Sequence, residues 1–542
     1  MSSSLRWAAF AFAVGLLAPA GAGASSLARG AVLSPDAELI VAAPNARMRG
    51  MLSAGMRSFL GIPYAKPPVG ALRWQPPQPV PYVPSLDATK FGNHCPQPAS
   101  AFGEASLTED CLYLNVFTPR HVGRDAHLPV MVWIHGGAFT TGESDDYDPE
   151  RFVSRNVIVV TLNYRLGLLG FYAQPALDRS AHPAVNYGLM DQQAALHWVA
   201  NNIGAFGGDP KKTMIFGESA GGLSVFSQLS SPRAAGLFSG ALIESGAYQL
   251  ALPTLAQSEA AGIATATALG CSNQSAACLR SVPVTTLVAT EGPMTVPTVD
   301  GDILPLSPGT ALATGAYNHV PVVDGSNHDE YRLFVAGDFD LSPNGPLTAA
   351  EYPAVIAASL GPTAAAEVVA QYPLANYPSP DLAFSAVVTD FIFACPALGA
   401  DIALSKAVPT FAYQFVDPNA PEPYLPPVSF PYAAAHASEI QFIWGSFTFP
   451  SQPLSSAERQ LGEQMVTYWT NFAKTHQPNA PGSPTWYPFA PAADDFLTLF
   501  PPKPYTSYGF ASDHKCAFWA SLAQQASMAK VRAAVRQVRN LR

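Results

Sequence analysis

The sequence predicts an α/β protein with a large, mostly parallel central sheet flanked by helices. Two runs of strand length, 129–134 and 157–165, are rich in apolar residues, an amphipathic helical pattern covers 188–200, and a third apolar strand follows at 213–216. Strand, helix and strand in this order are typical of the βαβ unit of a parallel sheet. Since no internal repeat or low-complexity linker divides the 542 residues, we expect a single domain over 25–542.

The third strand leads directly into a turn and a second helix. Residues 217–221 form the motif G-x-S-x-G with Ser219 at its centre, and a helical run follows at 223–229. Glycines on both sides of the serine allow strand and helix to approach closely, and the helix N-terminus favours negative charge beside the serine. The motif alone recurs by chance, so it is the preceding strand and the following helix that indicate the nucleophile turn of an α/β-hydrolase fold.

A glycine-containing turn follows the strand at 129–134. Its sequence, HGGAF, begins at His135 and lets backbone N–H groups face a ligand without side chains in the way. In α/β-hydrolases this position supplies part of the oxyanion hole, so we expect the amides of Gly137 and Ala138 to act together with that of Ala220. For His135 itself we expect a role in shaping the turn rather than in catalysis.

Residues 1–24 have the features of a secretory signal peptide. Arg6 provides an early positive charge, an apolar core covers 8–17, and A-x-A sequences occur at 20–22 and 22–24. We therefore predict a cleaved signal and a secreted or periplasmic protein, with a buried N-terminal helix as the alternative. The apolar core is too short to cross a bilayer, and no later run has the required length and purity, so we expect no membrane span.

Composition and charge limit the possible partners. Hydrophobic residues make up 48% of the chain and charged residues 13%, which is enough for a deep core and excludes general disorder. The formal net charge of −10 argues against nucleic acid as a partner.

Cysteine usage fits an exported protein. Six cysteines suggest three disulfides, and their spacings favour two short loops, Cys95–Cys111 and Cys271–Cys278, which leaves Cys395 for Cys516. Metal binding is the alternative, but no C-x-x-C pair and no histidine at ligand spacing accompanies them.

Other elements are expected outside this central region. Short strands are predicted at 31–33 and 39–42, and an ordered, extended loop at 59–74, where prolines exclude a helix. Near the C-terminus, a helix is predicted from about residue 457 to Pro478.

A set of short stretches carries a family resemblance. They are FLGIPYA (59–65), EDCLYLN (109–115), HGGAF (135–139), NYR (163–165), GLMDQQ (188–193), FGGDP (206–210) and FGESAGG (216–222). Their wording and order resemble the type-B carboxylesterase family, which includes the cholinesterases and bacterial para-nitrobenzyl esterases. The resemblance implies an α/β-hydrolase fold with short N-terminal strands and long loop insertions, and it implies hydrolysis of carboxylic esters.

A serine nucleophile needs a base, and the base needs an acid that orients it. In α/β-hydrolases the chain order is serine, acid, histidine. After the strand at 320–325, the residues up to Glu330 are similar to the family's G-x-N-x-D-E, which implies Glu330 as the acid. Chemistry alone leaves Asp329 as an equal alternative.

The base must be one of eleven histidines. HASEIQFIWG, which begins at His436, is similar to the family's histidine loop and lies after Glu330 as the chain order requires. The resemblance therefore implies His436 as the base. His328 is too close in sequence to the acid to be oriented by it easily.

The resemblance also places three further polar groups near the triad: Glu218 beside the nucleophile, Ser245 after the strand at 241–243, and Glu439 in the histidine loop. Ser245 and Glu439 have a simpler alternative role, which is to satisfy local backbone donors.

The implied reaction takes a small-molecule ester and water through an acyl-enzyme on Ser219, with no cofactor and no metal. One alternative is a binding protein that has kept the fold, against which the presence of all three triad residues argues. Another is a lipase, which would need a mobile apolar lid. The sequence does not indicate an oligomeric state.

Overall fold

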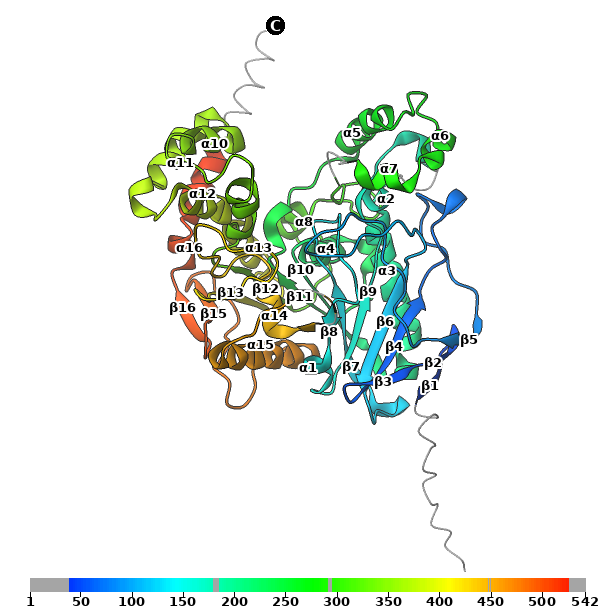
Figure 1. The fold of residues 1–542 in the computed structure, drawn as a ribbon. Coiled ribbons are helices and arrows are strands. Elements are labelled where there is room, and N and C mark those ends of the chain that lie inside the picture. The colour runs from blue at the N-terminus through cyan, green and yellow to red at the C-terminus, as the bar shows by residue number, and fades with distance from the viewer. Residues whose placement is uncertain (1–38, 179–184, 291–294, 447, 449, 526–542) are drawn as a thin grey trace, which may run out of the picture. The chain divides into compact units, whose positions relative to one another are not determined.

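An 11-stranded mixed sheet forms the centre of the molecule. The computed structural model describes residues 39–178, 185–290, 295–446, 448 and 450–525. In spatial order the strands are β16 (Tyr505–Tyr508), β15 (Asp495–Leu499), β13 (Thr410–Phe415), β12 (Val322–Asn327), β11 (Gly240–Glu244), β10 (Gly208–Glu218), β7 (Leu128–Ile134), β9 (Ile158–Leu162), β6 (Tyr113–Pro119), β4 (Met56–Pro63) and β3 (Met51–Ser53). Figure 1 shows these strands with helices on either side.

The middle of this sheet is parallel and its edges are antiparallel. Every neighbouring pair from β15 to β9 runs parallel, whereas β16 at one edge and β6, β4 and β3 at the other pair antiparallel. Helix α3 (Tyr187–Asn202) connects β9 to β10 and passes over β7, which lies between them. The predicted α/β class and its mostly parallel sheet are therefore confirmed.

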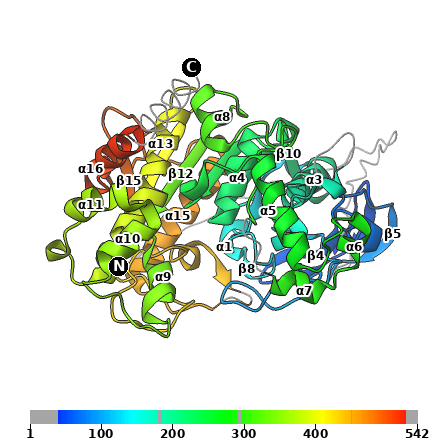
Figure 2. The same cartoon turned by 90° about the horizontal axis from the view of Figure 1, so that it is seen from above.

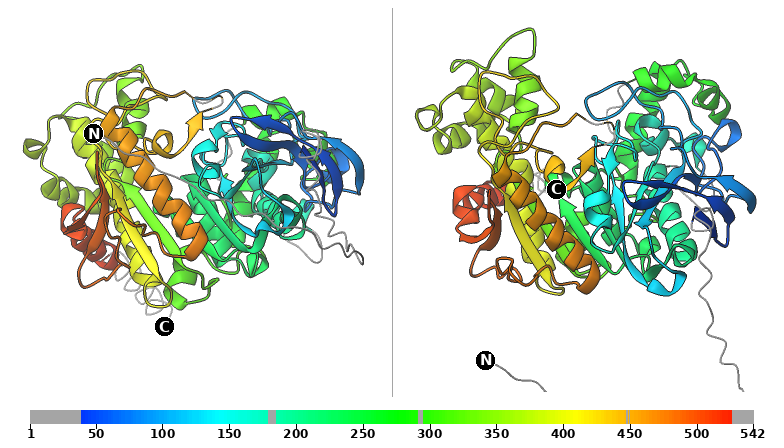
Figure 3. Two further views of the ribbon diagram at one scale, coloured as in Figure 1. Left: turned by 90° about the horizontal axis from the view of Figure 1, so that it is seen from below. Right: turned by 60° about the horizontal axis from the view of Figure 1, so that its bottom comes forward.

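Side chains alternate between two cores along each central strand, as the two-residue repeat of a strand requires. On β7, Val130, Val132 and Ile134 belong to one buried cluster, and Met131 and Trp133 to the other. Helices α3, α4 (Ala220–Ser230) and α13 (Cys395–Leu404) contribute to the first cluster, and α1 (Glu150–Val153) and α15 (Ser456–Thr475) to the second. Figure 3 shows α15 lying along the sheet.

Two groups of helices are inserted between the central elements. One consists of α5 (Leu255–Ala268), α6 (Ala276–Ser281) and α7 (Val284–Ala289), and the other of α10 (Tyr352–Leu360), α11 (Pro362–Gln371) and α12 (Pro380–Val388). The two groups lie at opposite sides of the described part (Figures 1 and 2). The remaining helices are α2 (Gly167–Phe171), α8 (Pro308–Thr314), α9 (Arg332–Val335), α14 (Ile440–Ile443) and α16 (Phe510–Asp513), and two π-helical segments, η8 (Ala336–Asp340) and η10 (Thr389–Ala394), follow α9 and α12.

Of the predictions for the N-terminal part of the chain, one is confirmed, one is wrong at its start and two lie outside the described residues. The strand expected at 39–42 is β1 (Ile40–Ala42), which pairs with β2 (Ala46–Arg49), while β5 (Val83–Asp87) completes that small sheet. The signal at 1–24 and the strand at 31–33 lie outside the described residues. The extended loop expected at 59–74 is wrong at its start, because β4 continues to Pro63, a strand end where the missing N–H of proline is tolerated.

The helix expected near the C-terminus is α15. It begins at Ser456 because Ser455 and Glu458 form a capping box, and it ends at Thr475, after which His476 adopts a left-handed φ of 58°. A small two-stranded sheet, β8 (Tyr147–Asp148) with β14 (Gly445–Ser446), joins the segment after β7 to the segment before α15.

One helical stretch, Pro380–Leu404, is long and apolar enough to cross a membrane by length and composition, and its most apolar 18-residue window has a mean hydropathy of 1.8. This corrects the expectation that no later run combines these two properties. In the structure the stretch consists of α12, η10 and α13, and 67% of its most apolar window is buried inside the protein. Its apolar character is therefore used in packing within the described part of the chain.

Candidate active site

Ser219 lies between the carboxyl end of β10 and the N-terminus of α4. Its backbone is strained, with φ 56° and ψ −120°, a conformation that non-glycine residues rarely adopt. Its N–H donates to the carbonyl of Glu244 at 2.9 Å, which anchors the turn to the neighbouring strand β11. The sharp turn leaves the serine half-buried while the residues on both sides are buried.

The glycines around Ser219 are required by close backbone approach. A Cβ on Gly221 would lie 2.0 Å from the carbonyl oxygen of Ile134, and one on Gly217 would lie 2.6 Å from the backbone of Gly221. Since real Cβ atoms do not approach that closely, a side chain at either position would push α4 away from β7 and β10. The G-x-S-x-G spacing thus follows from the packing of strand against helix.

Glu330 and His436 meet beyond the ends of β12 and β13. The Nδ1 atom of His436 lies 2.6 Å from Oε2 of Glu330, and both side chains are buried. Two further bonds fix the pair: the N–H of His436 donates to the carbonyl of Glu330 at 3.1 Å, and the N–H of Asn327 donates to Oε1 of Glu330 at 2.8 Å. The imidazole is therefore held in one orientation by a carboxylate.

The alternative acid, Asp329, has other partners. Its carboxylate lies 2.7 Å from Arg332 and 3.2 Å from His328, and these cations keep its pKa below the usual value although burial opposes this. His328 contacts Asp513 with its other ring nitrogen at 3.3 Å. Asp329 and His328 thus form a separate ion-pair group.

The second ring nitrogen of His436 faces the nucleophile turn. Nε2 lies 3.2 Å from Oε1 of Glu218 and has no hydrogen bond within the described part of the chain, so it is not bonded to Ser219. Catalytic bonds of this kind often close only when substrate is bound. Burial disfavours the charged imidazole, but the negative charges of Glu218 and Glu330 outweigh it and raise the pKa of His436 to about 9.

The turn after β7 lies against Ser219. A Cβ on Gly136 would come within 3.2 Å of the Cβ of Ser219, which shows how close the two turns are. Gly137, Ala138 and Phe139 all have left-handed backbones, with φ of 99°, 54° and 60°. The carbonyl of Gly137 accepts from the amides of Thr140 and Thr141, both at 2.9 Å, and so closes the turn.

His135 shapes this turn, as the sequence suggested. Its Nδ1 atom lies 2.9 Å from the carbonyl oxygen of Gly136, and its ring stacks on Tyr164 with the ring centres 4.5 Å apart. Burial lowers the pKa of His135 to about 4, so it is neutral at ordinary pH.

Glu218 and Glu439 are two buried acids whose charges act on His436. Burial raises the pKa of Glu218 to about 7 and that of Glu439 to about 8. Asn327 donates through its amide group to Oε2 of Glu439 and, at 2.8 Å, to the carbonyl of Ala435. Ser245 follows β11 with a left-handed φ of 52°, and its buried Oγ has no hydrogen-bond partner among the described residues.

Three residues beside His436 were missed by sequence reasoning. Asn327 joins Glu330, Glu439 and the histidine loop, and the asparagine of G-x-N-x-D-E was the signal that could have found it. Phe334 and Phe393 lie beside the imidazole, with ring centres 5.1 Å and 5.2 Å from it. Phe334 lies in α9 and Phe393 lies in η10, and no sequence pattern marks either position.

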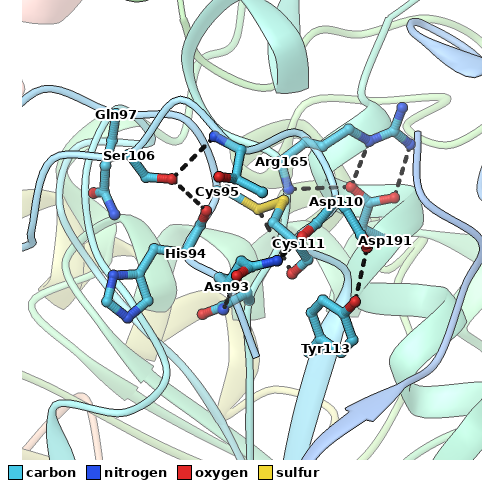
Figure 4. Close-up of a disulfide and its surroundings, with 12 residues drawn as sticks. Asn93, His94, Cys95, Gln97, Ser106, Asp110, Cys111, Tyr113, Arg165 and Asp191 are labelled. Atoms are coloured by element: carbon cyan, nitrogen blue, oxygen red, sulfur yellow. Dashed lines mark hydrogen bonds and ion pairs between the residues drawn. A yellow bond between two sulfur atoms is a disulfide. The ribbon is translucent and has the colours of Figure 1, made fainter. Parts of the chain in front are cut away.

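The structure contains three disulfides: Cys95–Cys111, Cys271–Cys278 and Cys395–Cys516. Figure 4 shows the first of them, with His94 and Gln97 to its left and the ion pair of Arg165 with Asp191 to its right. The third joins the first residue of α13 to a residue beyond α16 and has a sequence separation of 121.

Two groups of side chains are close enough to share a cation: His94 with Glu143 and Asp145, and His328 with Asp513 and His514. Both ring nitrogens of His94 and both of His328 already contact carboxylates. An imidazolium bonded in this way has no lone pair for a metal. We assign no metal to either group, and the expectation that the reaction needs neither metal nor cofactor stays a prediction.

A pocket opens at Thr140, beside the turn after β7. Its apolar lining includes Pro96, Leu166, Leu168 and Leu287. A smaller cavity is lined by Gly137, Tyr147, Glu218 and Ile440, among others. Apolar space thus lies beside the turn after β7, and the smaller cavity reaches Glu218 next to Ser219.

The parallel sheet, with a strained serine between a strand and a helix, defines the class of protein as a serine hydrolase of the α/β-hydrolase fold. Residues 37–519 match the model of the Carboxylesterase family, and the chain belongs to that family. It is a carboxylic-ester hydrolase, and the family resemblance seen in the sequence is confirmed.

Similar proteins come from animals and bacteria. The acylcarnitine hydrolase of Mus musculus is 35% identical over 489 residues, which cover 84% of this chain and 86% of that protein. The para-nitrobenzyl esterase of Bacillus subtilis (strain 168) is 35% identical over 468 residues, covering 81% and 90%. The cocaine esterase of Homo sapiens is 34% identical over 479 residues, covering 82% and 84%.

Proposed function

We propose that Ser219, His436 and Glu330 are the nucleophile, base and acid of an esterase that works through an acyl-enzyme. The observation that carries this proposal is the buried 2.6 Å contact between His436 and Glu330. Ser219, Glu330 and His436 all follow strands of the parallel part of the sheet, whose carboxyl ends share one edge. A strained serine and an oriented imidazole therefore lie on the same side of the molecule.

In the first half of the reaction, Oγ of Ser219 attacks the ester carbonyl carbon while its proton passes to Nε2 of His436. Glu330 stabilises the imidazolium that forms. The developing oxyanion is held by the amides of Gly137, Ala138 and Ala220, and losing one such donor typically costs about 3 to 4 kcal/mol of barrier. His436 then gives its proton to the departing alcohol oxygen, which leaves the acyl group on Ser219.

In the second half, water takes the place of the alcohol. His436 removes a proton from water as its oxygen attacks the acyl carbon, the oxyanion returns to the same three amides, and the carboxylic acid leaves as Oγ regains its proton. Each step uses groups of this chain and the two substrates, ester and water.

For the substrate we propose an ester with a sizeable apolar group. The apolar lining beside Thr140 supports this, because burying such a group contributes about 25 cal/mol per Å² of surface removed from water. The similar proteins are named for acylcarnitine, cocaine and para-nitrobenzyl esters, which share the carboxylic ester bond and little else.

Export is a further part of the proposal. Three disulfides support it, because such bonds persist in oxidising compartments. Together with the signal sequence predicted for residues 1–24, they favour a secreted or periplasmic enzyme.

Hydrolysis of para-nitrophenyl esters from acetate to long acyl chains tests the mechanism. We expect Ser219→Ala to lower turnover about 10⁴-fold or more on every ester, because losing the nucleophile of a triad removes covalent catalysis. Ser281→Ala, at an exposed serine, is the matched control. An organophosphate should label the wild type at Ser219 and leave Ser219→Ala unlabelled.

Two outcomes would change the proposal. If Ser219→Ala keeps wild-type turnover and the label falls elsewhere, Ser219 is not the nucleophile. If the rate on a long-chain ester jumps once the ester exceeds its solubility limit, the protein acts at interfaces as a lipase rather than on dissolved esters.

A further inference from the structure

A partly buried pair of ionic contacts joins His94 to the segment that follows the turn after β7. His94, the residue before Cys95, has its Nδ1 atom 3.1 Å from Glu143 and its Nε2 atom 2.9 Å from Asp145. Glu143 and Asp145 are buried, and the side chain of His94 is 18% exposed. One imidazole therefore joins two carboxylates that follow the turn closely in sequence.

The same segment is held by the rest of the disulfide loop. Gln97 accepts from the N–H of Gly142 at 2.6 Å and donates to Glu143 at 3.1 Å. The N–H of Glu104 also donates to Glu143, at 3.0 Å. The residues from His94 to Glu104 thus bind the segment from Gly142 to Asp145 through several hydrogen bonds and ion pairs.

This segment is directly continuous with the proposed oxyanion turn. Gly142 follows Thr141, whose amide bonds to Gly137, and a Cβ on Gly142 would lie 2.3 Å from the ring of His135. In the turn that carries the Gly137 and Ala138 amides, Ala138 and Phe139 have left-handed backbones, which are strained for residues other than glycine. Surrounding contacts must therefore hold this turn in place. A shift at Gly142 would therefore change where the two amides point.

We propose that His94 is a positioning residue for ester hydrolysis, whose two carboxylate contacts hold the turn that carries the Gly137 and Ala138 amides. This inference rests on the proposed function, because it gives those amides a part in stabilising the oxyanion. His94 touches neither the substrate nor Ser219 in this role. It acts through Glu143, Asp145 and the backbone between them and the turn.

The negative charges around position 94 explain why a cationic side chain is needed there. The acidic groups around it are Glu143, Asp145 and Asp146 on the segment after the turn, and Glu104 on the disulfide loop, while neutral His135 lies on the other side. The hydrogen bond to Asp145, with the charges of Asp145 and Glu143, raises the pKa of His94 to about 9. Burial raises the pKa values of Glu143 and Asp146.

The sign of the pH effect follows from these shifts. The imidazolium of His94 is present below about pH 9 and is lost as the pH rises through that value. Without its charge, the carboxylates of Glu143 and Asp145 repel each other and that of Asp146. The turn should therefore lose its support at alkaline pH in the wild type.

Three variants test the proposal: His94→Gln, which carries no charge and offers one amide nitrogen in place of two ring nitrogens, His94→Arg, which keeps the charge and can donate to both carboxylates, and His319→Gln. His319 is an exposed histidine whose Nε2 atom faces the carbonyl of Gly315. Rates on para-nitrophenyl butyrate are divided by the number of active sites, titrated with an organophosphate, so that misfolded protein is not counted.

We expect His94→Gln to lower kcat about tenfold with KM within about a factor of two, because the oxyanion forms only in the transition state. Its affinity for a trifluoromethyl ketone, whose hemiketal oxyanion uses the same amides, should fall by a similar factor. His94→Arg should recover both and should keep its rate above pH 9, where the wild type approaches His94→Gln. His319→Gln should behave as wild type.

The proposal is overturned if His94→Gln has wild-type kcat and ketone affinity per titrated site. It is also overturned if His94→Arg recovers neither quantity, or if the ratio of wild-type to His94→Gln rates is constant through pH 9. Ser219→Ala separates this result from the proposed mechanism. If Ser219→Ala is inactive and the His94 variants are normal, only the role of His94 fails, whereas an active Ser219→Ala removes the mechanism itself.

Discussion

His436 is surrounded by more negative charge than one acid would supply. Glu330 contacts one ring nitrogen at 2.6 Å and Glu218 lies 3.2 Å from the other. The pKa of about 9 means that His436 in the free enzyme is mostly an imidazolium at pH 7 and cannot then accept the proton of Ser219. Ester hydrolysis should therefore rise from neutral to alkaline pH as the imidazolium loses its proton.

Replacing Glu218 by Gln tests this environment. Removing a negative charge close to the imidazole should lower the pKa of His436 by about one unit or more, so the rising limb of kcat/KM should move to lower pH. The measurement is a pH profile on a soluble ester, with Glu367→Gln at an exposed position as the control. A limb that stays in place, or moves to higher pH, would show that Glu218 does not set the pKa of His436.

At the scale of residues, the sequence predicted which residues form the candidate site but not which side chains contact one another. Motif spacing identified Ser219 as the candidate nucleophile, because strain and glycine packing depend on local sequence. The choice between Glu330 and Asp329 came only from resemblance, since neighbouring carboxylates are chemically equal until their partners are known. Those partners, His436 for Glu330 and Arg332 for Asp329, are visible only in the folded chain.

At the scale of elements, hydrophobic patterns predicted the strands and helices of the sheet because both faces of it are buried. The two cores on β7 are an example, since a parallel strand covered on both sides reads as a continuous apolar run. The extension of β4 through Pro63 was missed because prolines dominate the sequence there. The burial of Asp324 on β12 and of Asp401 on α13 was also not predictable, because a buried acid looks like any other aspartate in sequence.

Asp324 and Asp401 are two fully buried aspartates, and the charge of Asp324 acts on Asp401. Burial raises the pKa of each well above its usual value, and for Asp401 the charge of Asp324 adds to the effect. Neither carboxylate oxygen of Asp401 has a hydrogen-bond partner in the described ranges. Raised pKa values mean that the stabilisation by the neutral carboxyls is complete below about pH 4 and is lost as the pH rises through the folded-state values.

Asp401→Asn should therefore stabilise the protein at pH 8. An amide cannot ionise, so we expect the free energy of unfolding to rise by about 1 to 3 kcal/mol, with a smaller gain at pH 5. Urea unfolding at the two pH values measures this, and Asp125→Asn at an exposed position is the control. A gain of the same size at both pH values, or a loss at pH 8, would contradict the account.

At the scale of the whole molecule, the disulfide Cys395–Cys516 closes a long loop. Its sequence separation is 121, compared with 7 for Cys271–Cys278. In the chain-entropy model a loop of about 100 residues is worth about 4 to 5 kcal/mol, and short loops are worth less. The two bonds therefore differ in the constraint that they place on the unfolded chain.

We expect the double variant Cys395→Ser/Cys516→Ser to lose about 2 to 5 kcal/mol of stability, and Cys271→Ser/Cys278→Ser to lose less. Thermal and urea unfolding of enzyme recovered outside the cytoplasm would show the difference. The same preparation should begin after residue 24 and contain no thiol before reduction. An N-terminus that still includes residues 1–24, together with free thiols, would refute the proposed export.

The distribution of the three proposed catalytic residues along the chain has a consequence for synthesis. A ribosome makes Ser219 first, then Glu330 and then His436, and β15 at Asp495–Leu499 completes the sheet beside β13 later still. A nascent chain thus carries a serine with no base to deprotonate it. With the proposed triad, Ser219 can be activated only after His436 has been made, which is late in translation.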